Sequence, residues 1–162
     1  MGLRLLKSFT LAFLLGFLSP VLSSAQSYGL IVHPSNSVDN LSFTELTRIL
    51  KGDRQYWPSG LRITITLPPP KSAERNFILK RIYQMSEDDY QTFWLGRVFR
   101  GEVMGSPLTV PTPQTIGQFV QEHEGVLGFI DINKLPRSAL RGIKILRIDG
   151  KKPDEAQYPL SP

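Results

Sequence analysis

The chain has no cysteine among its 162 residues and only two histidines. The absence of cysteine excludes disulfide frameworks, cysteine-ligated zinc sites, iron–sulfur clusters and thiol nucleophiles. The sequence also lacks a G-x-S-x-G elbow, an H-E-x-x-H motif, a Walker loop and a G-x-G-x-x-G loop. Because no set of nucleophile and base is legible without such motifs, we expect a protein that is not an enzyme and that holds no metal or cofactor.

An excess of charge of one sign is also missing. The chain has 19 basic and 14 acidic residues, which gives a formal net charge of +5. Arg4 and Lys7 belong to the first 25 residues, and without these two positive charges the net charge falls from +5 to +3. A domain with so small a charge is a poor candidate for nucleic-acid binding.

Residues 1–25 have the pattern of a secretory signal peptide. An apolar run over 9–18 follows the positive start and is too short to span a bilayer comfortably. Ser23 and Ala25 are small residues at the positions that signal peptidase inspects, so we predict cleavage after Ala25. The alternative is an uncleaved anchor. After cleavage we expect no membrane insertion, because no later stretch is long and apolar enough, and we predict secretion to the periplasm.

Strand and helix patterns then alternate through residues 26–150. Ser42 and Glu45 form an S-x-x-E capping box, which marks the start of an amphipathic helix. Strands are predicted over 28–33, 61–67, 126–130 and 143–148, and helices from Ser42, Ala73, Ser86 and Thr112. Strands separated by helices predict an α/β layered sheet. Residues 151–162 contain little apolar sequence, so we interpret them as a largely unpacked C-terminal tail.

The segment over 71–75 is the first candidate for ligand binding. It follows a predicted strand and opens a predicted helix, where unpaired amides and a partial positive charge favour anions. Ser72 would offer its hydroxyl, Ala73 its amide and Arg75 its charge. The alternative is that Ser72 is an ordinary N-cap and Arg75 a solvated residue of the first turn. Glu74 favours this alternative, because its carboxylate would repel an anion.

Ser35 and Asn36, which follow the first strand, are the second candidate ligand loop. Ligands of open α/β sheets lie beyond the carboxyl ends of the strands, so we expect this loop and Ser72 to border one pocket. The aromatic residues of the third helix are expected in the core: Tyr90, Phe93, Trp94 and Phe99. The basic C-terminal third is either a solvated face or a docking surface for an acidic protein.

Four segments resemble the phosphate ABC-transporter substrate-binding proteins, and more closely their short, single-domain secreted relatives. The segments are Ile31-Val32-His33-Pro34-Ser35-Asn36, the stretch from Leu41 to Gly52 with Trp57, the stretch from Met85 to Gly101, and Gly125 to Ile130. The second is similar to the family pattern L-S-x-x-E-L-x-x-I-F-x-G and is the most specific. The resemblance implies a single lobe of a type II periplasmic-binding-protein-like fold, with a mostly parallel sheet flanked by helices.

This resemblance implies binding of phosphate or a related oxyanion, and a place as the solute-binding component of ABC-type phosphate uptake. The family binds phosphate with a G-S-G-T-R turn, to which only Ser72 and Arg75 correspond. Both glycines of the turn are missing. The alternative is therefore a non-transport accessory of the cell envelope, a protein-binding module that has lost its anion-binding turn and contacts a membrane transporter or another envelope protein.

Overall fold

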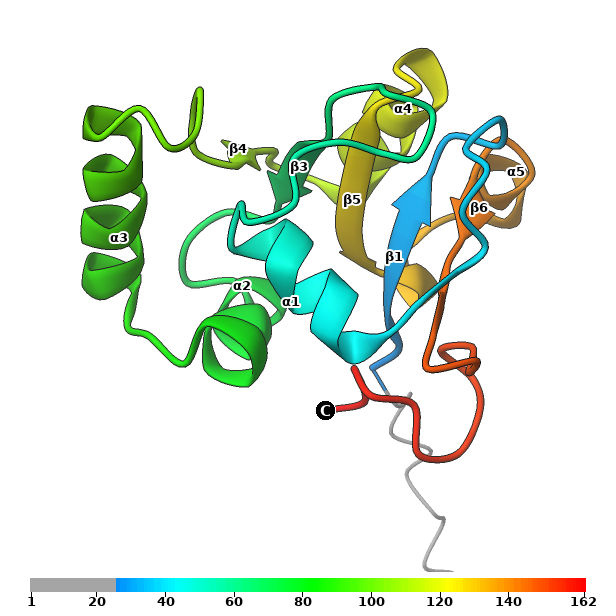
Figure 1. Cartoon of the computed structure of the whole chain (residues 1–162). Helices are drawn as coiled ribbons and strands as arrows, with labels where there is room; N and C mark the ends of the chain where they lie inside the picture. The colour runs from blue at the N-terminus through cyan, green and yellow to red at the C-terminus, as the bar shows by residue number, and fades with distance from the viewer. Residues whose placement is uncertain (1–25) are drawn as a thin grey trace, which may run out of the picture.

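A five-stranded sheet forms the centre of the computed structural model, which describes residues 26–162 (Figure 1). The predicted signal peptide, 1–25, lies outside the described residues. The strand order is β4-β3-β5-β1-β6. The strands are β1 (Tyr28–Val32), β3 (Thr64–Leu67), β4 (Leu108–Thr109), β5 (Val126–Asp131) and β6 (Lys144–Ile145). Only β1 runs against the others, since β3 pairs in parallel with β4 and β5 while β1 is antiparallel to β5 and β6. The predicted α/β fold with a mostly parallel sheet is confirmed.

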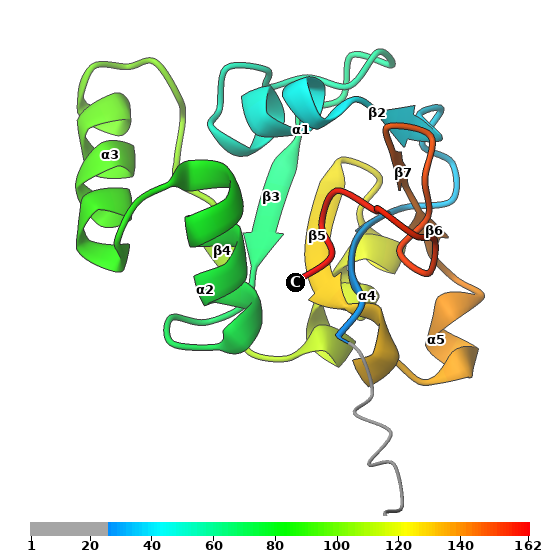
Figure 2. The same cartoon turned by 90° about the horizontal axis from the view of Figure 1, so that it is seen from below.

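Helices cover both faces of this sheet (Figures 1 and 2). One face carries α1 (Phe43–Leu50), α2 (Ala73–Ile78) and the π-helical turn η1 (Leu79–Tyr83), and the other carries α4 (Pro113–Glu122) and α5 (Arg137–Leu140). The alternation of side chains along β1 supplies both layers: Leu30 joins the first core cluster and Ile31 the second. Short segments complete the fold: β2 (Asn40–Leu41), β7 (Arg147–Ile148) and the 3₁₀ turn η2 (Ile132–Lys134).

The predicted local signals act as expected at α1 and β5. The Ser42 hydroxyl caps α1 by accepting a hydrogen bond from the Glu45 N–H at 3.1 Å. The Glu45 carboxylate in turn accepts one from the Ser42 N–H at 2.9 Å. At β5, Gly128 permits α4 to approach the sheet, because a Cβ there would lie 2.6 Å from Ile116 Cγ2. Trp57 packs in the core and its indole N–H donates to the Gly125 carbonyl at 3.1 Å.

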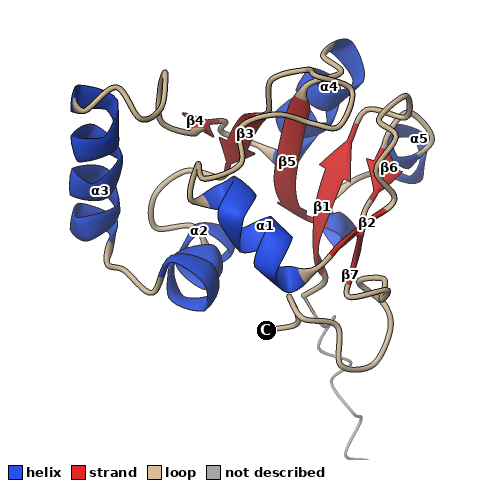
Figure 3. Cartoon of the chain, in the orientation of Figure 1, coloured by secondary structure: helices blue, strands red, loops and turns tan. Residues whose placement is uncertain are grey.

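Helix α3 (Glu87–Phe99) stands at the β4 edge of the molecule, apart from the two helical layers (Figure 3). Tyr90 and Trp94 are buried, as predicted. The prediction for Phe99 is wrong, because 82% of this residue is exposed. The helix packs on its neighbours along one narrow stripe, so the residues at its C-terminal end face solvent.

The last strand and the C-terminal segment also differ from the predictions. Leu146 divides the predicted strand into β6 and β7, and its N–H donates to the Leu30 carbonyl at 2.9 Å. Residues 151–162 are not an unpacked tail, because Tyr158 is 3% and Leu160 0% exposed within the main core cluster. These two side chains hold the segment against the core together with hydrogen bonds such as that from Arg81 Nε to the Pro159 carbonyl at 3.1 Å. Within residues 26–162, no helix is both long and apolar enough to cross a bilayer.

The buried C-terminal leucine gives a direct test of this packing. Leu160→Ala should lower the free energy of unfolding by about 2–5 kcal/mol, because it leaves a cavity in the core. The exposed neighbour Ser161→Ala should change it by less than about 0.5 kcal/mol. Urea unfolding followed by circular dichroism measures both. Equal stability of the two variants would mean that the C-terminal segment does not pack.

Candidate functional site

The two loops predicted to share a pocket lie at opposite ends of the sheet. Val32, at the end of β1, is paired with Leu127 near the start of β5, and Val126 is paired with Thr64 at the start of β3. The loop after β1 therefore lies where β3 begins, whereas Ser72 follows the end where β3 stops. The expectation of one shared pocket is wrong, and its cause is the antiparallel direction of β1.

Ser35 and Asn36 are engaged in local turn contacts. The Ser35 hydroxyl lies 2.6 Å from His33 Nδ1, and the Asn36 side chain accepts the Val38 N–H at 2.9 Å. The Asn36 carbonyl accepts a hydrogen bond from Lys144, which also pairs with Asp39. These contacts hold the loop beside β6, at a distance in the fold from α2.

Ser72 caps α2, as the alternative interpretation of this residue predicted. Its hydroxyl accepts the Arg75 N–H at 3.1 Å and donates to the Pro69 carbonyl at 2.8 Å. The hydroxyl is thus satisfied in both roles. Ala73 is exposed, and its amide and that of Glu74 belong to the first turn, where a helix has no acceptor of its own. Those two amides are what this turn retains for a ligand.

Arg75 is buried rather than solvated, with 3% of the residue exposed. Its Nε and Nη2 donate to the two carboxylate oxygens of Glu87 at 3.0 and 2.8 Å. The guanidinium also lies over the Tyr90 ring, with Cζ 4.2 Å from the ring centroid. This bidentate fork is the geometry by which arginine holds a carboxylate or phosphate ligand. In this chain an internal carboxylate, that of Glu87, is the partner of the fork.

The charge of Glu74 is also compensated within the chain. Glu74 is 4% exposed, and its carboxylate forms an ion pair with Lys134 of η2. A buried carboxylate costs free energy unless it is paired, so this contact ties α2 to the segment after β5. The repulsion that Glu74 was expected to exert on an anion is consequently reduced by Lys134.

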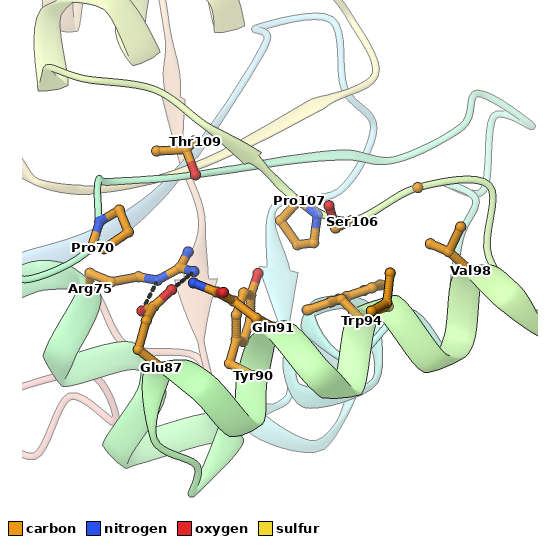
Figure 4. Close-up of a pocket in the computed structure, with 12 residues that line it drawn as sticks. Pro70, Arg75, Glu87, Tyr90, Gln91, Trp94, Val98, Ser106, Pro107 and Thr109 are labelled. Atoms are coloured by element: carbon orange, nitrogen blue, oxygen red, sulfur yellow. Dashed lines mark hydrogen bonds and ion pairs between the residues drawn. The ribbon is translucent and has the colours of Figure 1, made fainter.

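A cavity of about 460 Å³ lies between α2, α3 and the segment that leads into β4. Arg75 and Glu87 lie in one wall, while Trp94 and Val98 of α3 face Pro107 (Figure 4). Thr109 of β4 and Pro70, which follows β3, are also in the lining. The cavity therefore runs along the β4 edge of the sheet, from the carboxyl side of β3 at Pro70 to residues 105–107 on the amino side of β4. It combines one ion pair with a mostly apolar wall.

Three residues of this site were not recognised in the sequence as ligand-site residues: Glu87, Tyr90 and Thr109. Glu87 is separated from Arg75 by the π-helical turn, which no motif signals. Hydrogen bonds from Arg75 hold the pKa of the Glu87 carboxyl below its ordinary value, with burial opposing them. Burial raises the pKa of Tyr90 to about 12, so its hydroxyl is neutral at physiological pH. Among residues 26–162, no cluster of three acidic or histidine side chains could hold a metal ion.

The chain superposes on several solved structures, each over about half of that protein's length. The chain superposes on an ABC-type phosphate transport receptor from Vibrio cholerae with a TM-score of 0.65 and 18% identity, over 84% of this chain and 53% of that one. It superposes on a putative phosphate ABC transporter substrate-binding protein with bound phosphate from Clostridium perfringens with a TM-score of 0.60 and 16% identity, over 78% and 46%. It superposes on PstS from Borrelia burgdorferi with a TM-score of 0.58 and 15% identity, over 79% of this chain and 50% of that one.

These likenesses show the fold, and the resemblance predicted from the sequence is confirmed at that level. The chain spans about half the length of each of the three receptors. No family model matches the chain, and no curated protein matches its sequence. The protein thus has the fold of the phosphate ABC-transporter substrate-binding proteins.

The Arg75–Glu87 pair predicts a specific dependence of stability on pH. Because the pKa of Glu87 is lowered in the folded state, the pair stabilises the protein above the unfolded pKa of about 4.5 and loses this effect as pH falls through the lower folded value. Glu87→Gln should reduce the free energy of unfolding by about 1–2 kcal/mol at pH 7. The difference from wild type should shrink between about pH 5 and 3.

Urea unfolding at several pH values measures this difference directly. Other carboxylates with lowered pKa values, such as Glu45 and Glu102, titrate alike in both proteins and cancel. The control is Asp88→Asn, which removes the neighbouring exposed carboxylate that makes no ion pair. A difference between wild type and Glu87→Gln that stays constant across this range would contradict the assignment.

Proposed function

We propose that the protein is a periplasmic solute-binding-like protein that takes an oxyanion of the phosphate class in the cavity between α2 and α3. The observation that carries the proposal is the Arg75 guanidinium in the wall of that cavity, near Pro70, which follows the carboxyl end of β3. The names of the three phosphate receptors that share its fold support this ligand class. The proposal includes residues 1–25 as the signal peptide for export and the protein as the solute-binding component of an ABC-type phosphate transporter.

Binding depends on how the ligand shares Arg75 with Glu87. Nε and Nη2 of Arg75 are held by the Glu87 carboxylate, which does not engage Nη1. In Figure 4 the guanidinium points toward the space below Thr109. An oxyanion would bind Nη1 there, or displace Glu87 from the fork, and in either case it would meet the negative charge of that carboxylate. We therefore expect weak binding in the wild-type protein.

Calorimetric titration of residues 26–162 with inorganic phosphate tests the proposal. Wild type should bind in the millimolar range. Glu87→Gln should bind at least tenfold more tightly, because it removes a competing negative charge and frees the guanidinium. Arg75→Ala should abolish the heat of binding.

Two controls make the result specific. Arg48→Gln removes one exposed positive charge from α1 and should leave binding unchanged. Circular dichroism should show that Arg75→Ala remains folded, and Arg75→Lys provides a second variant if it does not. If neither wild type nor Glu87→Gln gives a heat of binding with phosphate at up to about 20 mM, oxyanion binding at this cavity is rejected.

A second candidate function is a protein-binding accessory of the cell envelope. It is favoured by the closed ion pair of Arg75 and by exposed apolar side chains: Val98 lines this cavity, while Met104 and Leu108 line the neighbouring hollow. Val98 is 39%, Met104 79% and Leu108 46% exposed. Exposed apolar side chains that gather in one area are typical of interaction surfaces. In this case an apolar segment of another protein, rather than an anion, would fill the cavity.

Site-directed photo-crosslinking in intact cells distinguishes this function. A photoreactive residue at Val98 or Met104 should give one discrete adduct with a different protein, while the same residue at Arg137, on α5 at the opposite edge of the sheet, should give none (Figure 1). The adduct should also be lost when Leu108 is changed to Lys, because the apolar contact would be removed. Equal labelling from all three positions would show that the surface is not selective.

A further inference from the structure

The wall of the cavity between α2 and α3 changes from charged to apolar along the axis of α3. Glu87, the first residue of the helix, pairs with Arg75, and Gln91 lies one turn further along. The lining residues of α3 beyond this turn are large and apolar: Trp94, Leu95 and Val98. Their spacing of three, four and seven residues from Gln91 puts them on the same face of the helix. One helix face therefore gives the cavity a charged end and an apolar end.

The opposite wall follows the same order (Figure 4). Pro70 and Thr109 line the charged end, and Pro107 lies across from Trp94 at the apolar end. Seven residues separate Glu87 from Trp94, which is about 10 Å at the rise of an α-helix. A ligand that reaches from the ion pair to the apolar end is therefore about 10 Å long.

The size of the cavity exceeds what a bare oxyanion needs. A phosphate ion consists of one phosphorus atom and its oxygens, whereas cavities of about 300–1,000 Å³ are typical of small organic ligands. The volume of about 460 Å³ falls within that range. A mostly apolar lining with a few polar groups that fix the orientation of the ligand is also typical of such sites.

We propose that the ligand of this cavity is an organic oxyanion, a phosphonate or phosphate monoester that carries an apolar group of the size of a phenyl ring. The inference rests on the oxyanion binding proposed above and names the class of its ligand. The anionic group binds Arg75 at the charged end of the cavity. The ring packs against Trp94 and Val98 at the other end, where an aromatic ring can stack on the indole.

An apolar group offsets the competition between the ligand and Glu87. Inorganic phosphate gains only its contacts at the charged end, where Arg75 is already held by a carboxylate. A ring that leaves water at the apolar end contributes binding free energy that does not depend on the guanidinium. A neutral apolar ligand would bind less well than an organic oxyanion, because it would remove water from the ion pair without replacing it.

Calorimetric titration of residues 26–162 with inorganic phosphate, methylphosphonate and phenylphosphonate tests this inference. The two phosphonates share the anionic group and differ in the apolar one. Phenylphosphonate should bind at least about tenfold more tightly than methylphosphonate, because its ring is buried at the apolar end. Arg75→Ala should abolish the binding of both, and Arg75→Lys serves as the second variant if Arg75→Ala does not fold.

A change at the apolar end tests where the ring lies. Val98 is 39% exposed and lines the cavity, so Val98→Ser should reduce the preference for phenylphosphonate over methylphosphonate by at least about threefold. Phe99→Ser is the matched control, since Phe99 belongs to the same helix and is 82% exposed but does not line the cavity. This control should keep the preference of wild type. An equal preference in Val98→Ser and Phe99→Ser would overturn the placement of the ring.

The titrations separate a failure of this inference from a failure of the proposed function. If phosphate and methylphosphonate bind but phenylphosphonate binds no more tightly, the oxyanion site stands and the organic ligand is overturned. If none of the three gives a heat of binding at up to about 20 mM, oxyanion binding itself fails. Phenylphosphonate that binds Arg75→Ala as tightly as wild type would also overturn the inference, because the anionic group would then have no part in recognition.

Discussion

The ion pair between Arg75 and Glu87 connects the parts of this molecule that matter most for function. Arg75 lies in α2, which packs on the sheet. Glu87 is the first residue of α3, which lies outside the two helical layers. The bidentate contact, with Tyr90 beneath the guanidinium, fixes the first turn of α3. Tyr90 and Trp94 then continue the attachment along the helix. The ion pair and these two buried aromatic side chains together position α3, which forms a wall of the cavity.

The same ion pair sets the chemistry of the cavity. A phosphate-binding site needs donors and positive charge that are free to meet the ligand. In this protein the chain provides the negative partner itself, and Glu74 is neutralised by Lys134. The lining is thus nearly neutral and largely apolar. Oxyanion uptake and protein binding differ in a single physical respect, which is whether the ligand or Glu87 holds the guanidinium.

Local sequence signals predicted most elements, and the errors come from contacts between distant residues. The capping box at Ser42 and the alternation at β5 depend on neighbours within a few positions, so they could be recognised directly. The direction of β1 depends on pairing with Leu127 and Ile145, about a hundred positions away, and no short motif encodes it. For that reason Ser35 was placed at the wrong end of the sheet.

The candidate site was predicted only in part, because it too depends on contacts between residues that are distant in the sequence. The N-cap role of Ser72 follows from its place before a helix, and it was foreseen as one of two alternatives. The burial of Arg75 depends on Glu87, which only the π-helical turn brings near it. The buried contacts of Tyr158 and Leu160 were missed because composition averages hide two apolar residues among prolines and polar side chains.

The position of β1 in the sheet has a consequence for export. This first strand lies between β5 and β6, and Leu160 is part of the main core cluster. The two strands that flank β1 are synthesised about a hundred residues after it, and Leu160 follows both of them. A nascent chain with such topology cannot complete its hydrophobic centre early. For the export proposed above, this late closure would keep the chain extended while it passes through a secretion channel.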